Sequence, residues 1–160
     1  ISVVSFNMLL KGFDEKPYYP DIPAALRAWQ WRKQQLERLI CGIDADIYCM
    51  QEVECSTFTE EFSFLERNGY SAIAPKDDSK GKIPELAKCA IFFKTKLQLI
   101  WHEHRSRAVL CALQHQSGQV IYFASCHLEG HPGEGRTRLT QLRNALQSIR
   151  KHQERCGCPD

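Results

Sequence analysis

The sequence lacks any apolar run long enough to cross a membrane, and it shows no secretory signal pattern. It also lacks an excess of one charge, since 21 Lys and Arg face 19 Asp and Glu and leave a net charge of +2. So small a balance gives no argument by itself for a nucleic-acid partner. Repeats and low-complexity segments are absent too. The 160 residues therefore have the length and composition of a globular domain with a hydrophobic core.

Zinc-type spacing is missing among the eight cysteines, and the CGC at residues 156–158 stands alone. Four cysteines share one setting, an apolar strand-like segment: Cys49, Cys89, Cys111 and Cys126. There a free thiol behaves as a small buried hydrophobic group. The pattern predicts reduced cysteines and an intracellular protein, in the cytoplasm or the nucleus.

What the sequence does contain is a series of short β-branched and aromatic runs, which predict strands. They are ISVVSFN (1–7), ADIYCMQ (45–51), YSAIA (70–74), CAIFFK (89–94), LQLIWHE (97–103), AVLCALQH (108–115) and QVIYFASCHL (119–128). The QSG between the last two runs predicts a hairpin turn.

Helical spacing of apolar residues predicts three helices, from Pro23 to about Gly42, from Thr57 to Asn68 and from Arg136 to His152. The first carries Leu26, Trp29, Leu36, Leu39, Ile40 and Ile43 as its apolar stripe, and the last carries Leu139, Leu142, Leu146 and Ile149. Helices between the early strands, followed by a run of strands and a final helix, indicate an α+β protein in which helices cover a mixed sheet.

Polar side chains stand where three of these strands end. Asn7 closes the first strand, Gln51 and Glu52 close the second, and His127 follows YFASC near the end of the last. Ligands of open α/β sheets bind at the carboxyl ends of strands, so these side chains are expected to meet at one rim.

The order and spacing of VVSFNML, DADIYCMQEV, CAIFFK, RAVLCALQ and IYFASCHLEG resemble the endonuclease/exonuclease/phosphatase superfamily, which has the DNase I-like fold. Within it, YYPDIPAALRAWQWRKQQLERLI looks like the nocturnin-like and carbon-catabolite-repressor-type deadenylase branch, with Trp29 or Trp31 and Arg32 as the matching residues. The long segment before CAIFFK also fits that branch.

The resemblance implies half of a four-layer α/β/β/α sandwich and a phosphoester hydrolase. Glu52 would coordinate Mg²⁺, with Mn²⁺ as a substitute, because a hard carboxylate oxygen suits a hard cation. Asn7 would bind the scissile phosphate or a metal-bound water, and His127 would donate to a phosphate oxygen. The reaction would be in-line attack of water, with the metal as Lewis acid.

Two further residues have supporting or open roles. Gln51 is expected to support neighbouring backbone rather than touch substrate. Arg107 either faces the site from its strand or forms an ordinary surface ion pair.

Two motifs of the superfamily, G-D-F-N and S-D-H, are absent, and the chain stops at ERCGCPD, where the strand leading to the first should begin. Residues 1–160 are therefore expected to be the N-terminal part of one domain, with the C-terminal half as their partner. Alone, this part is expected to expose an apolar sheet face and a strand edge, to associate, and to hydrolyse no phosphoester.

For the substrate, the resemblance favours RNA, with a 3′ poly(A) tail first and a nicotinamide dinucleotide phosphate as a nocturnin-like possibility. The alternatives within the superfamily are a phosphoinositide phosphatase, a sphingomyelinase or a DNA-repair nuclease. An alternative of another class is a catalytically silent binding module that kept the fold.

Overall fold

The structure is a computed structural model that describes residues 1–9, 19–76 and 88–157. Most of the Tyr- and Pro-containing segment before the first predicted helix, the long segment before CAIFFK, and Cys158 lie outside the described residues.

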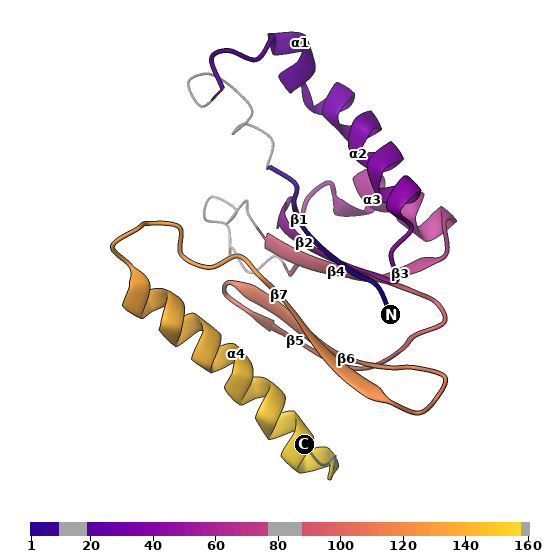
Figure 1. Ribbon diagram of the computed structural model, residues 1–160, viewed down its shortest axis with the longest axis vertical. Coiled ribbons are helices and arrows are strands. Elements are labelled where there is room, and N and C mark those ends of the chain that lie inside the picture. The colour runs from indigo at the N-terminus through magenta and orange to yellow at the C-terminus, as the bar shows by residue number, and fades with distance from the viewer. Residues whose placement is uncertain (10–18, 77–87, 158–160) are drawn as a thin grey trace.

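Two sheets form the centre of the molecule (Figure 1). In the first sheet the strand order is β1 (Val3–Asn7), β2 (Ile47–Val53), β4 (Lys88–Lys94) and β3 (Tyr70–Ile73). The second sheet contains β5 (Gln98–Arg105), β6 (Ala108–Gln114) and β7 (Val120–Cys126) in that order. Because β1 and β2 are parallel and all other pairs are antiparallel, the first sheet is mixed, as predicted.

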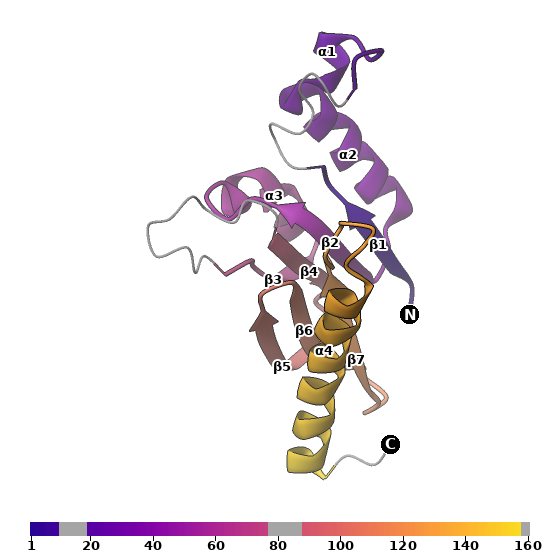
Figure 2. The same ribbon diagram turned by 90° about the vertical axis from the view of Figure 1, so that its left-hand side faces the viewer.

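Helices complete four layers (Figure 1), and in Figure 2 the C-terminal helix lies in front of the second sheet. The outer face of the first sheet packs against α2 (Trp29–Ile43) and α3 (Phe58–Arg67) through a core that includes Tyr48, Met50 and Leu65. The outer face of the second sheet packs against α4 (Gly135–Cys156). This α/β/β/α order confirms the predicted fold class. The short α1 (Ala24–Arg27) precedes α2.

The core between the sheets is almost entirely apolar. It joins Ile47, Cys49 and Ile91 of the first sheet to residues of the second that include Val109, Cys111 and Leu113. Alternation of side chains along a strand explains the arrangement, since Ile47 and Cys49 of β2 face the second sheet while Tyr48 and Met50 face the helices. The second sheet does not cover β1: Val4 and Phe6 pack toward the helices, but Val3 is 48% exposed and Ser5 and Asn7 are exposed as well. Among the described residues, the expected uncovered sheet face is therefore found at β1 and does not extend across the whole first sheet.

The helix expected to run unbroken from Pro23 is interrupted. Ala28 leaves helical geometry, with φ −54° and ψ 131°, so that α1 ends and α2 begins at this residue. Arg32 stabilises the break, because its guanidinium donates to the carbonyl oxygens of Arg27, Met8 and Leu9. Side-chain contacts to the segment that follows β1 therefore outweigh the helical spacing. The C-terminal end agrees with the prediction, since Asp44 adopts the left-handed conformation just after Ile43.

The apolar stripes of two helices are only partly buried. On α2, Ile40 is 2% exposed whereas Leu39 and Ile43 are both 46% exposed. On α4, three leucines of the predicted stripe are exposed: Leu139, Leu142 and Leu146.

The buried face of α4 is instead formed by Ala145, Ser148 and His152. Ser148 hydrogen-bonds Arg105 and Glu103 of β5, while His152 stacks on Trp101 with ring centroids 4.6 Å apart. Polar and aromatic contacts to the second sheet thus fix the rotation of α4, and the leucines point away from that contact.

Other elements match the sequence closely. α3 begins after Thr57 and ends before Asn68, and the QSG turn joins β6 to β7. Gly118 supplies the positive φ of 85° that this turn requires, and its N–H donates to the carbonyl oxygen of His115. Among the described helices, none combines the length and apolarity of a membrane crossing.

Candidate active site

Three of the side chains predicted to meet at one rim do come together. Asn7 ends β1, Glu52 lies in β2, and His127 follows β7, so the cluster joins both sheets. Asn7 Nδ2 donates to Glu52 Oε1 at 2.7 Å, and His127 Nε2 lies 3.5 Å from the same oxygen. The Glu52 side chain is 17% exposed and that of His127 is 26% exposed, so both border solvent from a largely enclosed position.

The backbone at Glu52 is unusual. Its φ is 58°, in the left-handed region that residues other than Gly and Asn rarely adopt. At the same place, the pairing of β2 with β4 shifts register, between Met50 and Val53. Such a conformation costs on the order of 1–3 kcal/mol and persists only where surrounding contacts enforce it. The irregular backbone of this β-bulge is therefore located at Glu52, at the rim.

The amide of Asn7 is held from behind. Leu9 has a φ of 54°, and its N–H donates to Asn7 Oδ1 at 2.8 Å. Because Oδ1 accepts this bond, the Asn7 NH₂ group faces Glu52. An amide nitrogen carries two hydrogens, so one donor remains for a further oxygen.

His127 is anchored through its backbone. Its N–H donates to the carbonyl oxygen of Arg107 at 2.9 Å. Its ring atom Nδ1 is buried, and within the described part of the chain it is the buried side-chain polar atom that lacks a hydrogen-bond partner. A buried polar atom without a partner is costly, so the ring is poised to gain one from a ligand or from another segment.

Gln51 lies behind the rim and is 8% exposed. Its Nε2 donates to the carbonyl oxygen of Cys49 at 2.8 Å and to Ser125 Oγ at 3.1 Å. The side chain points into the space between the sheets and not toward Glu52. Sequence reasoning missed Ser125, although a hydroxyl in the apolar run YFASC, two residues before His127, is a signal for it.

Arg107 borders the site but forms an ion pair. Its Nη2 lies 3.0 Å from Glu129 Oε2. A hydrogen bond from the backbone N–H of His131 and the charge of Arg107 lower the pKa of Glu129. Of the two readings of Arg107, the geometry shows the surface pair.

No family model matches the chain. A curated relative, the CCR4-Not complex 3′-5′-exoribonuclease subunit Ccr4 of Candida glabrata, is 25% identical over 169 residues, covering 82% of this chain and 19% of Ccr4. A crystal structure of ANGEL2, described as a 2′,3′-cyclic phosphatase, is 27% identical with a TM-score of 0.82, covering 94% of this chain and 47% of ANGEL2. An endonuclease/exonuclease/phosphatase from Bacteroides vulgatus shares the fold at a TM-score of 0.66 and 16% identity, over 93% of this chain and 61% of its own.

A Ccr4 subunit of Candida albicans is 32% identical over 117 residues, covering 69% of this chain and 15% of that Ccr4. The chain belongs to the Ccr4-type branch of the endonuclease/exonuclease/phosphatase superfamily. Within the superfamily, its curated relatives are Ccr4-type proteins, which confirms the predicted branch. The chain spans about a fifth of the length of the Ccr4 relative and about half of the ANGEL2 chain.

Two residues of the predicted branch signature pack beside the superfamily site. Trp29 Nε1 donates to Glu61 Oε1 at 2.7 Å, and the Arg32 guanidinium stacks over the Trp29 ring at 5.1 Å from its centroid. Since Arg32 also binds the carbonyl oxygens of Met8 and Leu9, the pair fixes the segment that follows Asn7. Trp31 is 43% exposed and does not take this position.

Nucleases of the superfamily generally depend on a divalent metal ion. The donor set fits one: Glu52 offers a carboxylate oxygen at the rim, and Mg²⁺ keeps several waters and uses few protein ligands. Among the described residues no three His, Cys, Asp or Glu gather as a complete metal site. Glu52 would thus hold the metal as one ligand among waters.

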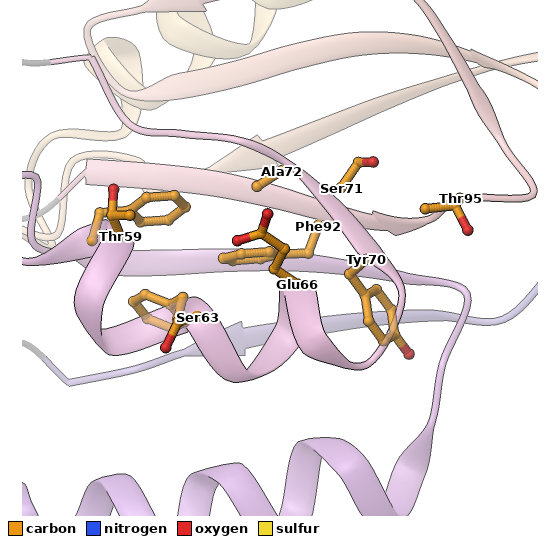
Figure 3. Close-up of a pocket in the computed structure, with 10 residues that line it drawn as sticks. Thr59, Ser63, Glu66, Tyr70, Ser71, Ala72, Phe92 and Thr95 are labelled. Atoms are coloured by element: carbon orange, nitrogen blue, oxygen red, sulfur yellow. The ribbon is translucent and has the colours of Figure 1, made fainter.

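A separate cavity of about 470 Å³ lies on the outer face of the first sheet, between α3 and the strands β3 and β4 (Figure 3). Phe58, Phe62 and Phe92 form its apolar wall, and Thr59, Ser63 and Glu66 come from α3. None of the predicted site residues lines it. The candidate active site is therefore the rim and not this cavity.

Proposed function

We propose that the chain is the N-terminal part of a Mg²⁺-dependent phosphoester hydrolase that shortens RNA from its 3′ end, with poly(A) as the preferred substrate. The observation that carries this proposal is that Asn7 and His127 both approach the same carboxylate oxygen of Glu52. The Ccr4 relatives support the choice of RNA, because Ccr4 is named as a 3′-5′-exoribonuclease.

Each residue has a role that its geometry permits. Glu52 binds the metal through its carboxylate, which Asn7 orients with a hydrogen bond of 2.7 Å. The second N–H of Asn7 donates to the scissile phosphate, and His127 Nε2 donates to a phosphate oxygen as negative charge develops in the transition state. A bound Mg²⁺ supplies Lewis-acid stabilisation of the phosphate and the leaving oxygen.

We also propose that the C-terminal part of the same domain completes the two sheets. Within the described residues β7 pairs only with β6, which leaves its other edge for a further strand. Beside it α4 exposes three leucines, and Leu146 is 65% exposed. A covering segment would bury this stripe and supply the residues that activate water.

The compartment follows from the cysteines. The seven that the structure describes form no disulfide, which supports a reducing, intracellular setting in the cytoplasm or nucleus.

Removal of a 2′,3′-cyclic phosphate is a second candidate function. The observation that favours it is the likeness to ANGEL2, at a TM-score of 0.82 over 94% of this chain. Both candidates place the 3′ end of an RNA at the rim, so they differ in the bond that is broken.

A substrate panel given to the full-length protein with Mg²⁺ separates these functions. Its members are 5′-labelled RNA ending in adenosines with a free 3′-hydroxyl, the same RNA ending in a 2′,3′-cyclic phosphate, a nicotinamide dinucleotide phosphate, abasic DNA, an inositol phosphate and sphingomyelin. A ladder of shortened RNA supports the exonuclease, whereas loss of the cyclic phosphate at constant length supports the phosphatase. Preference for the inositol or lipid substrate overturns both, and turnover of none supports a silent module.

Substitution of Glu52 tests the site. Glu52→Gln keeps the shape and removes the charge, so turnover should fall on the order of a hundredfold or more. Glu66→Gln is the matched control, because this exposed carboxylate lies in the last turn of α3, which carries none of the three rim residues. Near-normal turnover of Glu52→Gln at saturating Mg²⁺ contradicts the assignment.

A further inference from the structure

A buried hydrogen-bonded bridge crosses the apolar core between the two sheets. Ser125 of β7 is fully buried, and its Oγ donates to the carbonyl oxygen of Met50 at 2.8 Å. The same Oγ accepts a hydrogen bond from Gln51 Nε2 at 3.1 Å. Ser125 thus binds both the backbone and a side chain of β2 from the opposite sheet.

Polar groups are exceptional at this interface. The buried side chains of the apolar cluster between the sheets are aliphatic, aromatic or thiol groups. Burying a hydroxyl there costs free energy unless it is hydrogen-bonded, and an apolar residue of similar size would avoid that cost. The bridge therefore calls for a role beyond adhesion of the sheets.

The bridge lies immediately behind the active-site rim. Gln51 directly precedes Glu52, and His127 follows the end of β7, two residues after Ser125. At about 3.3 Å per residue along a strand, the bridge is within roughly 7 Å of both rim residues along the chain. Apolar contacts are non-directional, so they permit small shifts between sheets that a hydrogen bond does not.

We propose that Ser125, with Gln51, is a positioning residue that fixes the spacing of Glu52 and His127 across the two sheets. The distance it maintains is the 3.5 Å between Glu52 Oε1 and His127 Nε2. Misplacement of catalytic groups by an ångström lowers turnover far more than it lowers substrate binding. The catalytic part of this inference rests on the proposed function, whereas the spacing itself does not.

The test compares Ser125→Ala with Ser148→Ala in the full-length protein. Ser148 is a matched control, because it is 1% exposed and hydrogen-bonded to Glu103 and Arg105 beneath α4, away from the rim. Both variants should lose thermal stability. Ser125→Ala should also lower kcat about tenfold or more with KM nearly unchanged, whereas Ser148→Ala should leave kcat unchanged.

A second readout does not depend on activity. In the metal-free protein, Ser125→Ala should shift the NMR resonances of the His127 ring, identified by their loss in His127→Asn, and Ser148→Ala should not. Ser125→Cys keeps the size of the residue but has a weak donor, so it should fold and give intermediate shifts. If the protein is inactive, the proposed function fails and the ring resonances still decide the inference. Unshifted resonances, or a kcat that follows stability equally in both alanine variants, overturn it.

Discussion

Asp46 ties the far end of the β1–β2 pair together, opposite the rim. Its Oδ2 accepts the N–H of Ser2 at 2.9 Å, and its Oδ1 lies 2.7 Å from Lys96 Nζ. The hydrogen bond from Lys96 is the main reason that the pKa of Asp46 is lowered from 3.8 to about 2, followed by the bond from Ser2. Replacing Asp46 with Asn keeps an oxygen that can accept from Ser2 and removes the charge.

The expected loss of stability in Asp46→Asn can be worked out from the lowered pKa of Asp46. A pKa lowered by roughly 1.8 units corresponds to about 2.4 kcal/mol at 1.36 kcal/mol per unit. Because Lys96 is 46% exposed, solvent screening reduces this, and we expect a loss of about 1–2 kcal/mol for Asp46→Asn at pH 7. A lowered carboxyl pKa stabilises the folded protein above pH 4, and the contribution disappears as the pH falls from about 4 toward 2.

The assay is urea unfolding of both proteins, followed by circular dichroism at pH 7 and pH 3. The difference between them should fall to roughly half at pH 3. Asp44→Asn is the control: the Asp44 side chain is 68% exposed in its pair with Lys94, and the change should be smaller. A difference that is the same at both pH values, or below about 0.5 kcal/mol at pH 7, refutes the reasoning.

Three further changes test the site, the core and the proposed domain. In the full-length protein, His127→Ala should lower kcat about a hundredfold while the affinity for Mg²⁺ stays the same, and the exposed His102→Ala should change neither; a large loss of Mg²⁺ affinity with intact kcat would reverse the roles. Tyr48→Phe should destabilise the protein by about 1–3 kcal/mol in urea unfolding, because the fully buried hydroxyl accepts a backbone N–H that would lose its partner. Leu146→Cys should react with a maleimide at least tenfold more slowly than the exposed Gln147→Cys in the native full-length protein, measured by peptide mass mapping. Equal rates would show that no further segment covers α4.

Much of the fold can be read from the sequence, since the strands are short runs of β-branched and aromatic residues between clear turn residues. The convergence at the rim was also predictable. Asn7 and Glu52 end neighbouring parallel strands, and His127 is delivered by the outer strand of the second sheet. The positions of these three residues at strand ends are therefore enough to predict the cluster, and no side-chain contact has to be known.

The remaining features depend on contacts that the sequence does not express. Nothing in QEV indicates the left-handed backbone of Glu52, which coincides with the register shift in the pairing of β2 with β4. The rotation of α4 depends on Ser148 and His152 meeting β5 and β7, and apolar spacing alone predicts a neighbouring face, of which Ile149 still packs against the core. The break at Ala28 likewise accompanies the hydrogen bonds of Arg32 to Met8 and Leu9, which follow β1.

The strand order also has a consequence for folding. The second sheet is a meander in which β5, β6 and β7 pair with their neighbours in sequence, so its contacts are local. The first sheet needs the parallel pair β1–β2, whose anchoring residues Ser2 and Asp46 are 44 positions apart. Pairing between strands far apart in the sequence first requires a long loop to close, which costs conformational entropy before contacts form, so such pairs form slowly. The meander should thus gain protection from hydrogen exchange first, and Asn7 and Glu52 should be joined late, on a platform that already carries His127.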